Sequence, residues 1–169
     1  MTKLDSNLFQ GMKRLFVIDL GGNSLETLPL VNDHENLILL ALDNNKFTSL
    51  HLTTDLTDAS LSDTLVQSSD VGFLHGLTNL QTLQLESNEL VELPPNIFKG
   101  LFNLNNVFLS KNRLTNLAFD IFRDTVNINL IDLSNNMLTK CPNITHLYLL
   151  EFLNLRGNTL TRLDPGTFS

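Results

Sequence analysis

The chain is poor in several residue types that particular protein classes need. It contains one cysteine in 169 residues, which excludes an internal disulfide framework and a four-cysteine zinc module. Glycine (8 residues) and proline (5 residues) are too scarce for a collagen-like or flexible low-complexity chain. Acidic residues (18) outnumber Lys and Arg (11), and the net charge of −7 has the opposite sign to the basic surface of nucleic-acid-binding proteins. We therefore expect no nucleic-acid partner.

Long apolar segments are also missing. No stretch reaches the 18 or more apolar residues that a membrane-spanning helix needs, and residues 1–6 lack the apolar core of a signal peptide. On these grounds alone the chain would be a cytosolic protein. Both ends, however, match parts of a repeating pattern, so we expect a longer array that is truncated at both ends. Any contact with a membrane would then be made through segments outside this chain.

The repeating pattern is carried by the two most abundant residue types, leucine (38 residues) and asparagine (21 residues). The frame L-x-x-L-x-L-x-x-N-x-L-x-x-L recurs, for example from Leu80 to Leu93, with other apolar residues replacing some leucines. The asparagines of its six clear copies are Asn23, Asn45, Asn88, Asn112, Asn136 and Asn158. These asparagines are 22, 43, 24, 24 and 22 residues apart. A fixed period of this length predicts an array of equivalent structural units.

The 43-residue gap leaves two interpretations of residues 51–73. One is a degenerate copy of the repeat, and the other is a surface insertion. The positions of the degenerate copy would be Leu56, Ala59, Leu61, Thr64, Val66 and Ser69. With that copy, about seven repeats cover residues 1–169.

An aromatic residue follows the last aliphatic position of the frame by five residues in four copies. These residues are Phe9, Phe98, Phe122 and Phe168. Their constant phase relative to the leucines predicts a second stacked column beneath the outer wall of the array.

The leucine spacing predicts short strands that cannot bury their apolar face alone. In Leu83-Gln84-Leu85 the two leucines point to one side and Gln84 points to the other, because side chains alternate along a strand. Stacking equivalent strands from successive repeats buries a continuous column of leucines. The fold class is therefore an α/β solenoid: a curved horseshoe with a parallel sheet on the concave face and loops or short helical turns on the convex face.

The repeated asparagine is explained by the backbone groups of the turn after each strand. Buried N–H and C=O groups need partners, and an asparagine side chain donates and accepts at the same time. We expect the six repeat asparagines to form a structural ladder along the turn. The competing explanation is turn propensity alone.

The frame resembles the leucine-rich repeat family, and seven copies in phase cover nearly the whole chain. The 24-residue spacing, with Leu93-Pro94 followed by Phe98, is similar to the extracellular type of repeat. The strings at 93–98, 108–112, 130–136 and 163–168 resemble leucine-rich-repeat G-protein-coupled receptors of the relaxin type. Lamprey antigen receptors and Slit-like guidance proteins would also fit these strings.

Function in a solenoid is expected on the exposed concave sheet. Acidic and apolar residues recur at the outward positions, which suits a protein or peptide ligand with a cationic part and an apolar anchor. Aspartate just before the last strand leucine is also a common family choice whatever the ligand. The candidate ligand-binding residues are Asp19, Leu39, Asp43, Gln84, Glu86, Phe108, Leu130, Asp132, Phe152, Asn154 and Arg156.

Motifs for catalysis or for cofactor binding are not found. The four histidines have no metal-binding spacing, and no phosphate-binding glycine loop or nucleophile elbow occurs. Cys141 takes a leucine position of the frame, so we expect a buried apolar role for it. We expect no enzyme, no metal and no cofactor. Asn143-Ile144-Thr145 is the single N-glycosylation sequon, and Asn143 is the candidate acceptor.

Three functional settings follow from these residues and this resemblance. The first is the ectodomain of a G-protein-coupled hormone or peptide receptor, on the extracellular side of the plasma membrane. The second is an adhesion, matrix or innate-immune recognition module without a seven-helix bundle. The third is an intracellular scaffold, which the missing signal sequence favours and the 24-residue repeat with phenylalanine disfavours.

Overall fold

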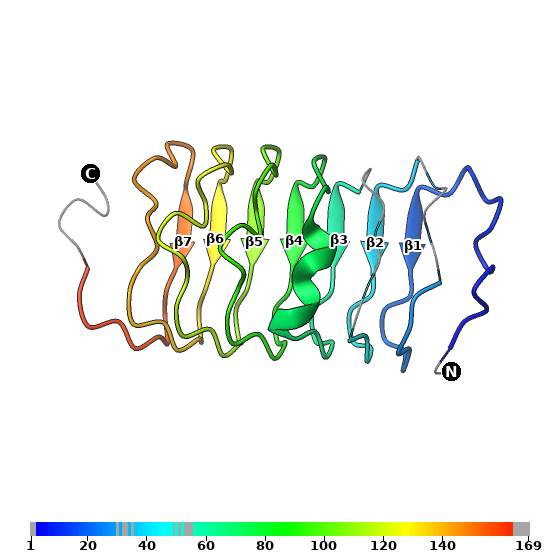
Figure 1. Ribbon diagram of the computed structural model, residues 1–169, viewed down its shortest axis with the longest axis horizontal. Coiled ribbons are helices and arrows are strands. Elements are labelled where there is room, and N and C mark those ends of the chain that lie inside the picture. Colours follow the sequence, from blue (N-terminus) through cyan, green and yellow to red (C-terminus); the bar gives the residue numbers. More distant parts are fainter. Residues whose placement is uncertain are drawn as a thin grey trace.

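The computed structural model describes residues 3–29, 31, 34, 36–48, 50, 52 and 56–163. Seven three-residue strands stand side by side in one parallel sheet, in the order in which they occur along the chain (Figure 1). The strands are β1 (Val17–Asp19), β2 (Leu39–Ala41), β3 (Asp58–Ser60), β4 (Thr82–Gln84), β5 (Asn106–Phe108), β6 (Leu130–Asp132) and β7 (Phe152–Asn154). Each strand begins one coil of a continuous right-to-left row in Figure 1, which confirms the predicted solenoid.

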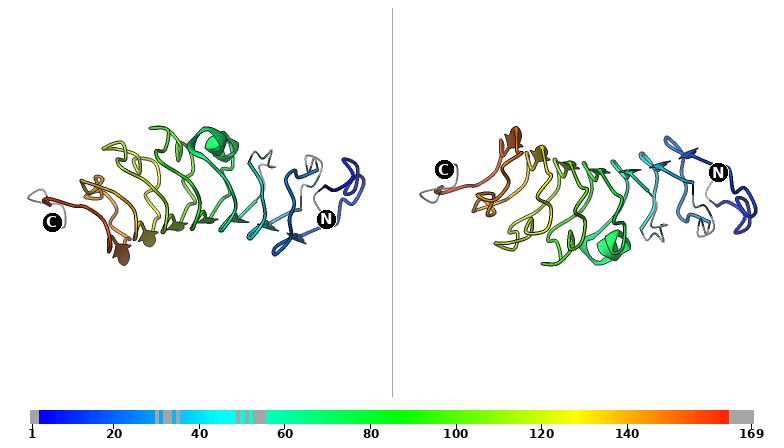
Figure 2. Two further views of the ribbon diagram at one scale, coloured as in Figure 1. Left: turned by 90° about the horizontal axis from the view of Figure 1, so that it is seen from below. Right: turned by 90° about the horizontal axis from the view of Figure 1, so that it is seen from above.

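The row of coils follows a shallow arc. Figure 2 shows the strands along the inner side of this arc and the connecting segments along the outer side. The outer side also carries a 3-10 helix, η1 (Ser68–Leu74). The sheet therefore forms the concave face, as in the expected horseshoe fold class.

The strands pair without any shift of register. Ile18 pairs with Leu40, Leu83 pairs with Val107, and Ile131 pairs with Leu153. These middle residues all point into the interior, whereas the first and third residues of each strand point outward. In-register pairing therefore aligns the leucine positions of successive coils.

The segment that departs most from the frame also contributes a strand. Within residues 51–73, β3 pairs with β2 and with β4, and Ala59 lies opposite Leu40 and Leu83. Residues 51 and 53–55 of this segment lie outside the described residues. Ala59 is buried, so the alanine occupies the interior position that leucine or isoleucine takes in other coils.

The interior is one continuous apolar column. The buried residues include Leu40, Leu83, Val107 and Ile131 beneath the sheet. Fully burying such a side chain contributes about 1.5–3 kcal/mol. Repetition in every coil makes this the main driving force for stacking.

A second column lies beneath the convex side. The rings of Phe98 and Phe122 are buried and stack with centroids 5.5 Å apart and an interplanar angle of 8°. Phe9 is partly buried against the same core, and Phe168 lies outside the described residues. The stacking of Phe98 on Phe122 confirms the column for these two coils.

The repeat asparagines join successive coils at the turn after each strand. Asn112 accepts the N–H of Leu90 through Oδ1 at 3.1 Å, and its Nδ2 donates to Leu85 O at 2.8 Å and to Leu109 O at 3.1 Å. Leu85 and Leu90 belong to the preceding coil. The side chains that make this same set of contacts are Asn45, Asn88, Asn112, Asn136 and Asn158.

The first repeat asparagine differs from the others. Asn23 is exposed, and its partners among the described residues are the carbonyls of Leu20 and Gly21 in its own coil. Its amide therefore closes one turn and does not bridge two coils.

The ladder is also interrupted at Thr64, where the third coil lacks asparagine. The Thr64 hydroxyl lies 3.0 Å from Leu61 O and 2.7 Å from Asn88 Oδ1. Both groups belong to its own or the following coil, and none of its described partners is in the preceding coil. Among the described residues, the joint between the second and third coils consequently lacks an asparagine rung, although Thr57 Oγ1 donates to Ile38 O across it at 3.0 Å.

The residue just before each ladder position adopts a left-handed backbone. Asn44, Asp63, Ser87, Lys111 and Asn135 have φ between 51° and 55°, and Gly22 and Gly157 occupy the same place in the first and last turns. From Gly22 to Asn135, this conformation aims the N–H at the next coil, for example Lys111 N at Ser134 O over 2.9 Å. Non-glycine residues adopt it at a cost of about 1–2 kcal/mol.

A second set of asparagine bonds links the coils on the segment that returns to the sheet. Asn36 donates to Lys13 O at 2.9 Å, Asn103 to Thr78 O at 2.9 Å, and Asn127 to Phe102 O at 2.8 Å. Each of these asparagines stands directly before the first apolar residue of the frame. This set of bonds was not predicted from the sequence, although the constant position of its asparagines in the frame was a usable signal.

Candidate functional site

The concave face presents the first and third residues of each strand, together with the residue two positions after the strand. The middle residue of every strand is buried or, in β7, half-buried. All candidate ligand-binding residues are exposed or half-buried on this face: Asp19, Leu39, Gln84, Phe108, Leu130, Asp132, Phe152 and Asn154 in strands, and Asp43, Glu86 and Arg156 beyond them. The face therefore brings them into one surface.

Carboxylates gather on the part of this face formed by β2, β3 and β4. Asp43 accepts from Asn44 Nδ2 at 3.1 Å, and Asp58 accepts from Thr57 Oγ1 at 2.8 Å. Glu86 accepts from the hydroxyl of Ser62 in the neighbouring coil. These partners are neutral side chains, so these hydrogen bonds do not offset the formal negative charge of the three carboxylates. Such charges attract and orient a cationic ligand.

Two ion pairs in the described part of the chain lie elsewhere. Arg113 lies 3.8 Å from Glu89, and Arg123 lies 2.7 Å from Asp120. All four side chains belong to turns and convex segments outside the concave face. Arg156, at the β7 end, is the cationic member of the candidate set.

Three candidates have a structural role that competes with ligand binding. Asp19 accepts the N–H of Gly21 at 3.0 Å, Asp132 accepts that of Ser134 at 2.8 Å, and Asn154 accepts that of Arg156 at 3.1 Å. Each side chain thereby stabilises the turn two residues after it, as Asp and Asn commonly do. This hydrogen bond is a physical reason why aspartate recurs directly before the frame leucine that follows the strand, as in Asp19-Leu20 and Asp132-Leu133.

A hollow of about 310 Å³ lies on the face between β2 and β4. It exists because Ala41, Ala59 and Ser60 are small where other coils carry larger residues. Leu39, Asp43, Asp58, Thr82 and Gln84 surround it. The sequence predicts Leu39, Asp43 and Gln84 as site residues. The hollow was not predicted, and its signal was the small residues at the outward positions of two adjacent coils.

Apolar side chains gather at the other end of the face, on β5, β6 and β7. Leu130 pairs directly with Phe152, and Phe108 lies on the neighbouring strand. Phe152 remains 49% exposed. An exposed phenylalanine beside a leucine offers an anchor point for an apolar side chain of a ligand.

Cys141 is half-buried rather than fully buried, and this corrects the sequence expectation. Burial raises the pKa of its thiol above the ordinary value of cysteine. At the equivalent position of the frame, Leu28 and Leu117 are half-buried as well, whereas Leu50 and Leu93 are buried.

Neither a metal-ligand cluster nor a membrane-spanning helix occurs among the described residues. In the part of the chain that the structure describes, no set of three or more His, Cys, Asp or Glu side chains is placed to hold a metal ion. Among the same residues, no helix has the length and apolarity needed to cross a bilayer.

Family models for leucine-rich repeats match two parts of the chain, residues 54–114 and residues 149–169. These matches support the leucine-rich repeat family. The first match includes β3, β4 and β5. It therefore covers the third coil, which begins with β3 and departs most from the frame. The two matched ranges include the ladder residues Asn88, Asn112 and Asn158.

The solenoid is similar to a solved leucine-rich repeat protein of Leptospira interrogans. The two share 27% sequence identity with a TM-score of 0.70, over 97% of this chain and 47% of the other. Decorin from Rattus norvegicus is 28% identical over 96 residues, which cover 53% of this chain and 27% of decorin. The chain thus spans about half of the solved structure and about a quarter of the curated relative.

Proposed function

We propose that this chain is a protein- or peptide-binding leucine-rich repeat module whose concave sheet is the binding face. The observation that carries the proposal is the uneven distribution of acidic and aromatic side chains along the sheet, although Asp132 also lies on β6 and Leu39 on β2. Asp43, Asp58 and Glu86 lie on or beside β2 to β4, and Phe108, Leu130 and Phe152 lie on β5 to β7. A ligand with a basic part and an apolar part is complementary to both regions when it crosses the strands.

The dimensions of the face support a polypeptide ligand. Neighbouring strands lie about 4.8 Å apart, so seven strands span about 29 Å. An extended chain advances about 3.3 Å per residue, and about nine residues would cross the whole sheet. The hollow beside Asp43 and the exposed Phe152 are then separated enough to bind different side chains of one ligand.

The biological setting is part of the proposal. The resemblance to relaxin-type receptors supports the ectodomain of a G-protein-coupled hormone or peptide receptor. The similarity to decorin supports the alternative, an extracellular matrix or adhesion module without a seven-helix bundle. Adjoining coding sequence separates the two: seven apolar spans would favour the receptor, and one span or none would favour the alternative.

Selection from a random-peptide display library on the immobilised chain tests the binding proposal. We expect the selected peptides to contain Lys or Arg together with an apolar residue, and their association rate to fall as salt screens the carboxylates. The variant Asp43→Lys with Glu86→Lys should lower that rate about tenfold or more. The matched control Glu26→Lys with Glu92→Lys changes the net charge equally at exposed positions outside the candidate face.

The two variants give distinct results if the concave face binds the ligand. Loss of association in the concave variant, with the control close to the unmodified chain, supports the proposal. Equal behaviour of both variants, or no enrichment of any peptide, contradicts it.

A further inference from the structure

The sequon at Asn143 lies on a firmly held segment of the coil between β6 and β7. Pro142 and Ile144 are buried, whereas Asn143 is half-exposed and Thr145 is exposed. The alternation anchors the segment through two apolar side chains and turns the sequon residues toward solvent. The site lies midway between the two strands along the chain, so a group attached there leaves the concave sheet free.

The carboxamide of Asn143 is oriented by its own sequon. Its Oδ1 accepts from Thr145 N at 3.2 Å and from Thr145 Oγ1 at 2.8 Å. Within the described residues its Nδ2 has no hydrogen-bond partner. The nitrogen to which an N-linked sugar is joined is therefore the open end of a fixed amide.

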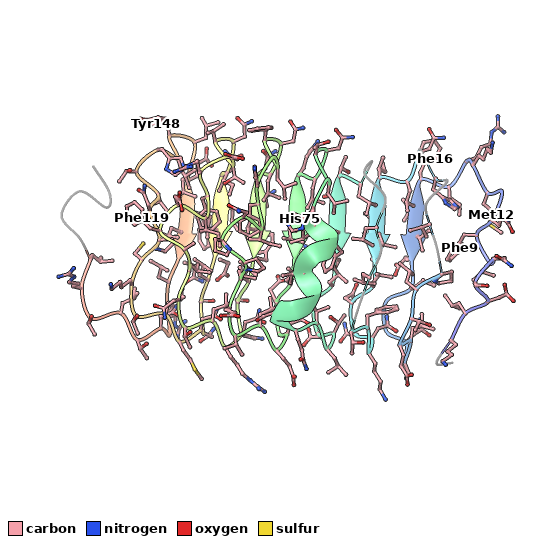
Figure 3. All side chains as sticks on the ribbon, viewed as in Figure 1. Phe9, Met12, Phe16, His75, Phe119 and Tyr148 are labelled. Atoms are coloured by element: carbon pink, nitrogen blue, oxygen red, sulfur yellow. The ribbon has the colours of Figure 1, made fainter. Side chains whose placement is uncertain are left out.

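An exposed aromatic side chain belongs to the segment beside this amide. The N–H of Asn143 donates to Phe119 O in the preceding coil over 3.0 Å, which holds the two backbones together. Phe119 is 72% exposed, more than Phe16, Phe102 or Phe152, the other exposed phenylalanines among the described residues. Figure 3 marks it among the C-terminal coils.

We infer that Asn143 carries an N-linked glycan whose first N-acetylglucosamine packs on the ring of Phe119. The face of an aromatic ring carries negative charge density and attracts the positively polarised C–H groups of a sugar. The contact would also remove apolar ring surface from water. This sugar contact gives a physical reason for a phenylalanine exposed at position 119.

Attachment follows ordinary N-glycosylation chemistry. Asn143 Nδ2 loses a proton and forms a bond to C1 of the sugar, while the bond from C1 to a lipid-linked diphosphate breaks and that diphosphate leaves. The donor and the transferase belong to the secretory pathway, so the inference rests on the extracellular setting of the proposed function. Directing the chain into that pathway with an added signal peptide tests the acceptor site separately from ligand binding.

The experiment compares one sequence with and without its first sugar. The chain is produced in a bacterium, and also secreted from cultured cells and trimmed by an endoglycosidase to a single N-acetylglucosamine. Mass spectrometry measures occupancy at Asn143, and thermal unfolding gives the Tm of both forms. The same pair of preparations is made for Phe119→Ala, for Phe119→Trp, and for Phe102→Ala as a matched exposed-phenylalanine control.

We expect occupancy at Asn143 and a Tm about 2–4 °C higher for the form with the sugar. That difference should vanish in Phe119→Ala, and persist in Phe119→Trp and in Phe102→Ala. An unmodified Asn143 in the secreted chain overturns the inference. A sugar-dependent rise in Tm that is unchanged in Phe119→Ala also overturns the packing contact, while leaving the peptide-binding proposal untouched.

Discussion

Replacing Asn112 by alanine removes one complete rung of the ladder between two central coils. The side chain is 6% exposed and bonds to both coils that it joins. Alanine fits the same backbone but offers neither a donor nor an acceptor. The substitution therefore measures what the rung contributes to stacking.

The expected loss of unfolding free energy depends on which backbone groups are left without any hydrogen-bond partner. The N–H of Leu90 loses its Asn112 acceptor, and an unsatisfied buried donor costs about 1–3 kcal/mol. Leu85 O keeps the amide of Asn88, and Leu109 O keeps that of Asn136. These two carbonyls are weakened rather than stranded, so we expect a total loss of about 2–4 kcal/mol.

Urea unfolding followed by circular dichroism measures this loss. With a slope of about 1–3 kcal/mol per molar urea, the midpoint should fall by about 1 M or more. Asn23→Ala is the matched control, because Asn23 is exposed and bonds to carbonyls of its own coil. Its expected cost is below about 0.5 kcal/mol.

Comparing the urea midpoints of the two variants tests whether an asparagine that bridges two coils adds stability. Equal midpoints for Asn112→Ala and Asn23→Ala would show that bridging between coils adds nothing to stability, and turn propensity alone would then explain the repeated asparagine. A loss confined to Asn112→Ala supports the bridging role.

Three other substitutions and one alkylation experiment test further features of the coils. Thr64→Asn should restore the missing rung and raise the free energy of unfolding by about 0.5–1.5 kcal/mol in urea titrations; a lower stability would contradict the stacking geometry inferred there. Lys111→Gly should raise it by about 0.5–1 kcal/mol, because glycine adopts the left-handed turn without strain, and an unchanged urea midpoint would argue against strain at that turn. Gly157→Ala should destabilise, since φ is 70° and a Cβ would lie 2.6 Å from Asn135 Oδ1; a neutral effect in the same assay would show that this turn adjusts freely. Alkylation of Cys141 by iodoacetamide should be slower than that of free cysteine at pH 7 and should accelerate at a pH above the ordinary thiol pKa, because burial raises its pKa; a reaction as fast as that of free cysteine would contradict this.

The solenoid could be predicted because stacking imposes the same demand on every coil. Interior positions such as Leu83 and Val107 must be apolar and must recur in phase, so the frame itself carries the fold. The stacked rings of Phe98 and Phe122 were predictable for the same reason.

The third coil was harder to predict because its own residues specify it weakly. Ala59 and Thr64 stand where other coils have larger aliphatic residues and asparagine. The strand forms with help from its neighbours: Leu42 N donates to Ser60 O at 2.8 Å, and Leu61 N donates to Gln84 O at 2.8 Å. Tertiary context of this kind overrides weak local preference and is not visible in one segment of sequence.

The sequence predicted which residues of the candidate site face outward, but not what each of them contacts. Alternation along the strands identified the outward residues, including Phe108 and Leu130. It could not reveal that Asp132 stabilises its own turn, nor that small residues on adjacent coils leave a hollow, because both depend on neighbouring atoms in three dimensions. Ligand binding by these residues and glycosylation of Asn143 stay predictions.

The coils are joined by the interior apolar column, by backbone hydrogen bonds and by asparagine amides, and the outward side chains of the sheet add fewer bonds, such as that of Ser62 to Glu86. Mutation can therefore diversify the recognition surface while the scaffold keeps its stability, which is a favourable condition for evolving new specificities. Duplication or excision of one 24-residue unit, such as residues 89–112, would preserve the chemistry of every joint. It would lengthen or shorten the reach of the surface by one strand spacing, about 4.8 Å.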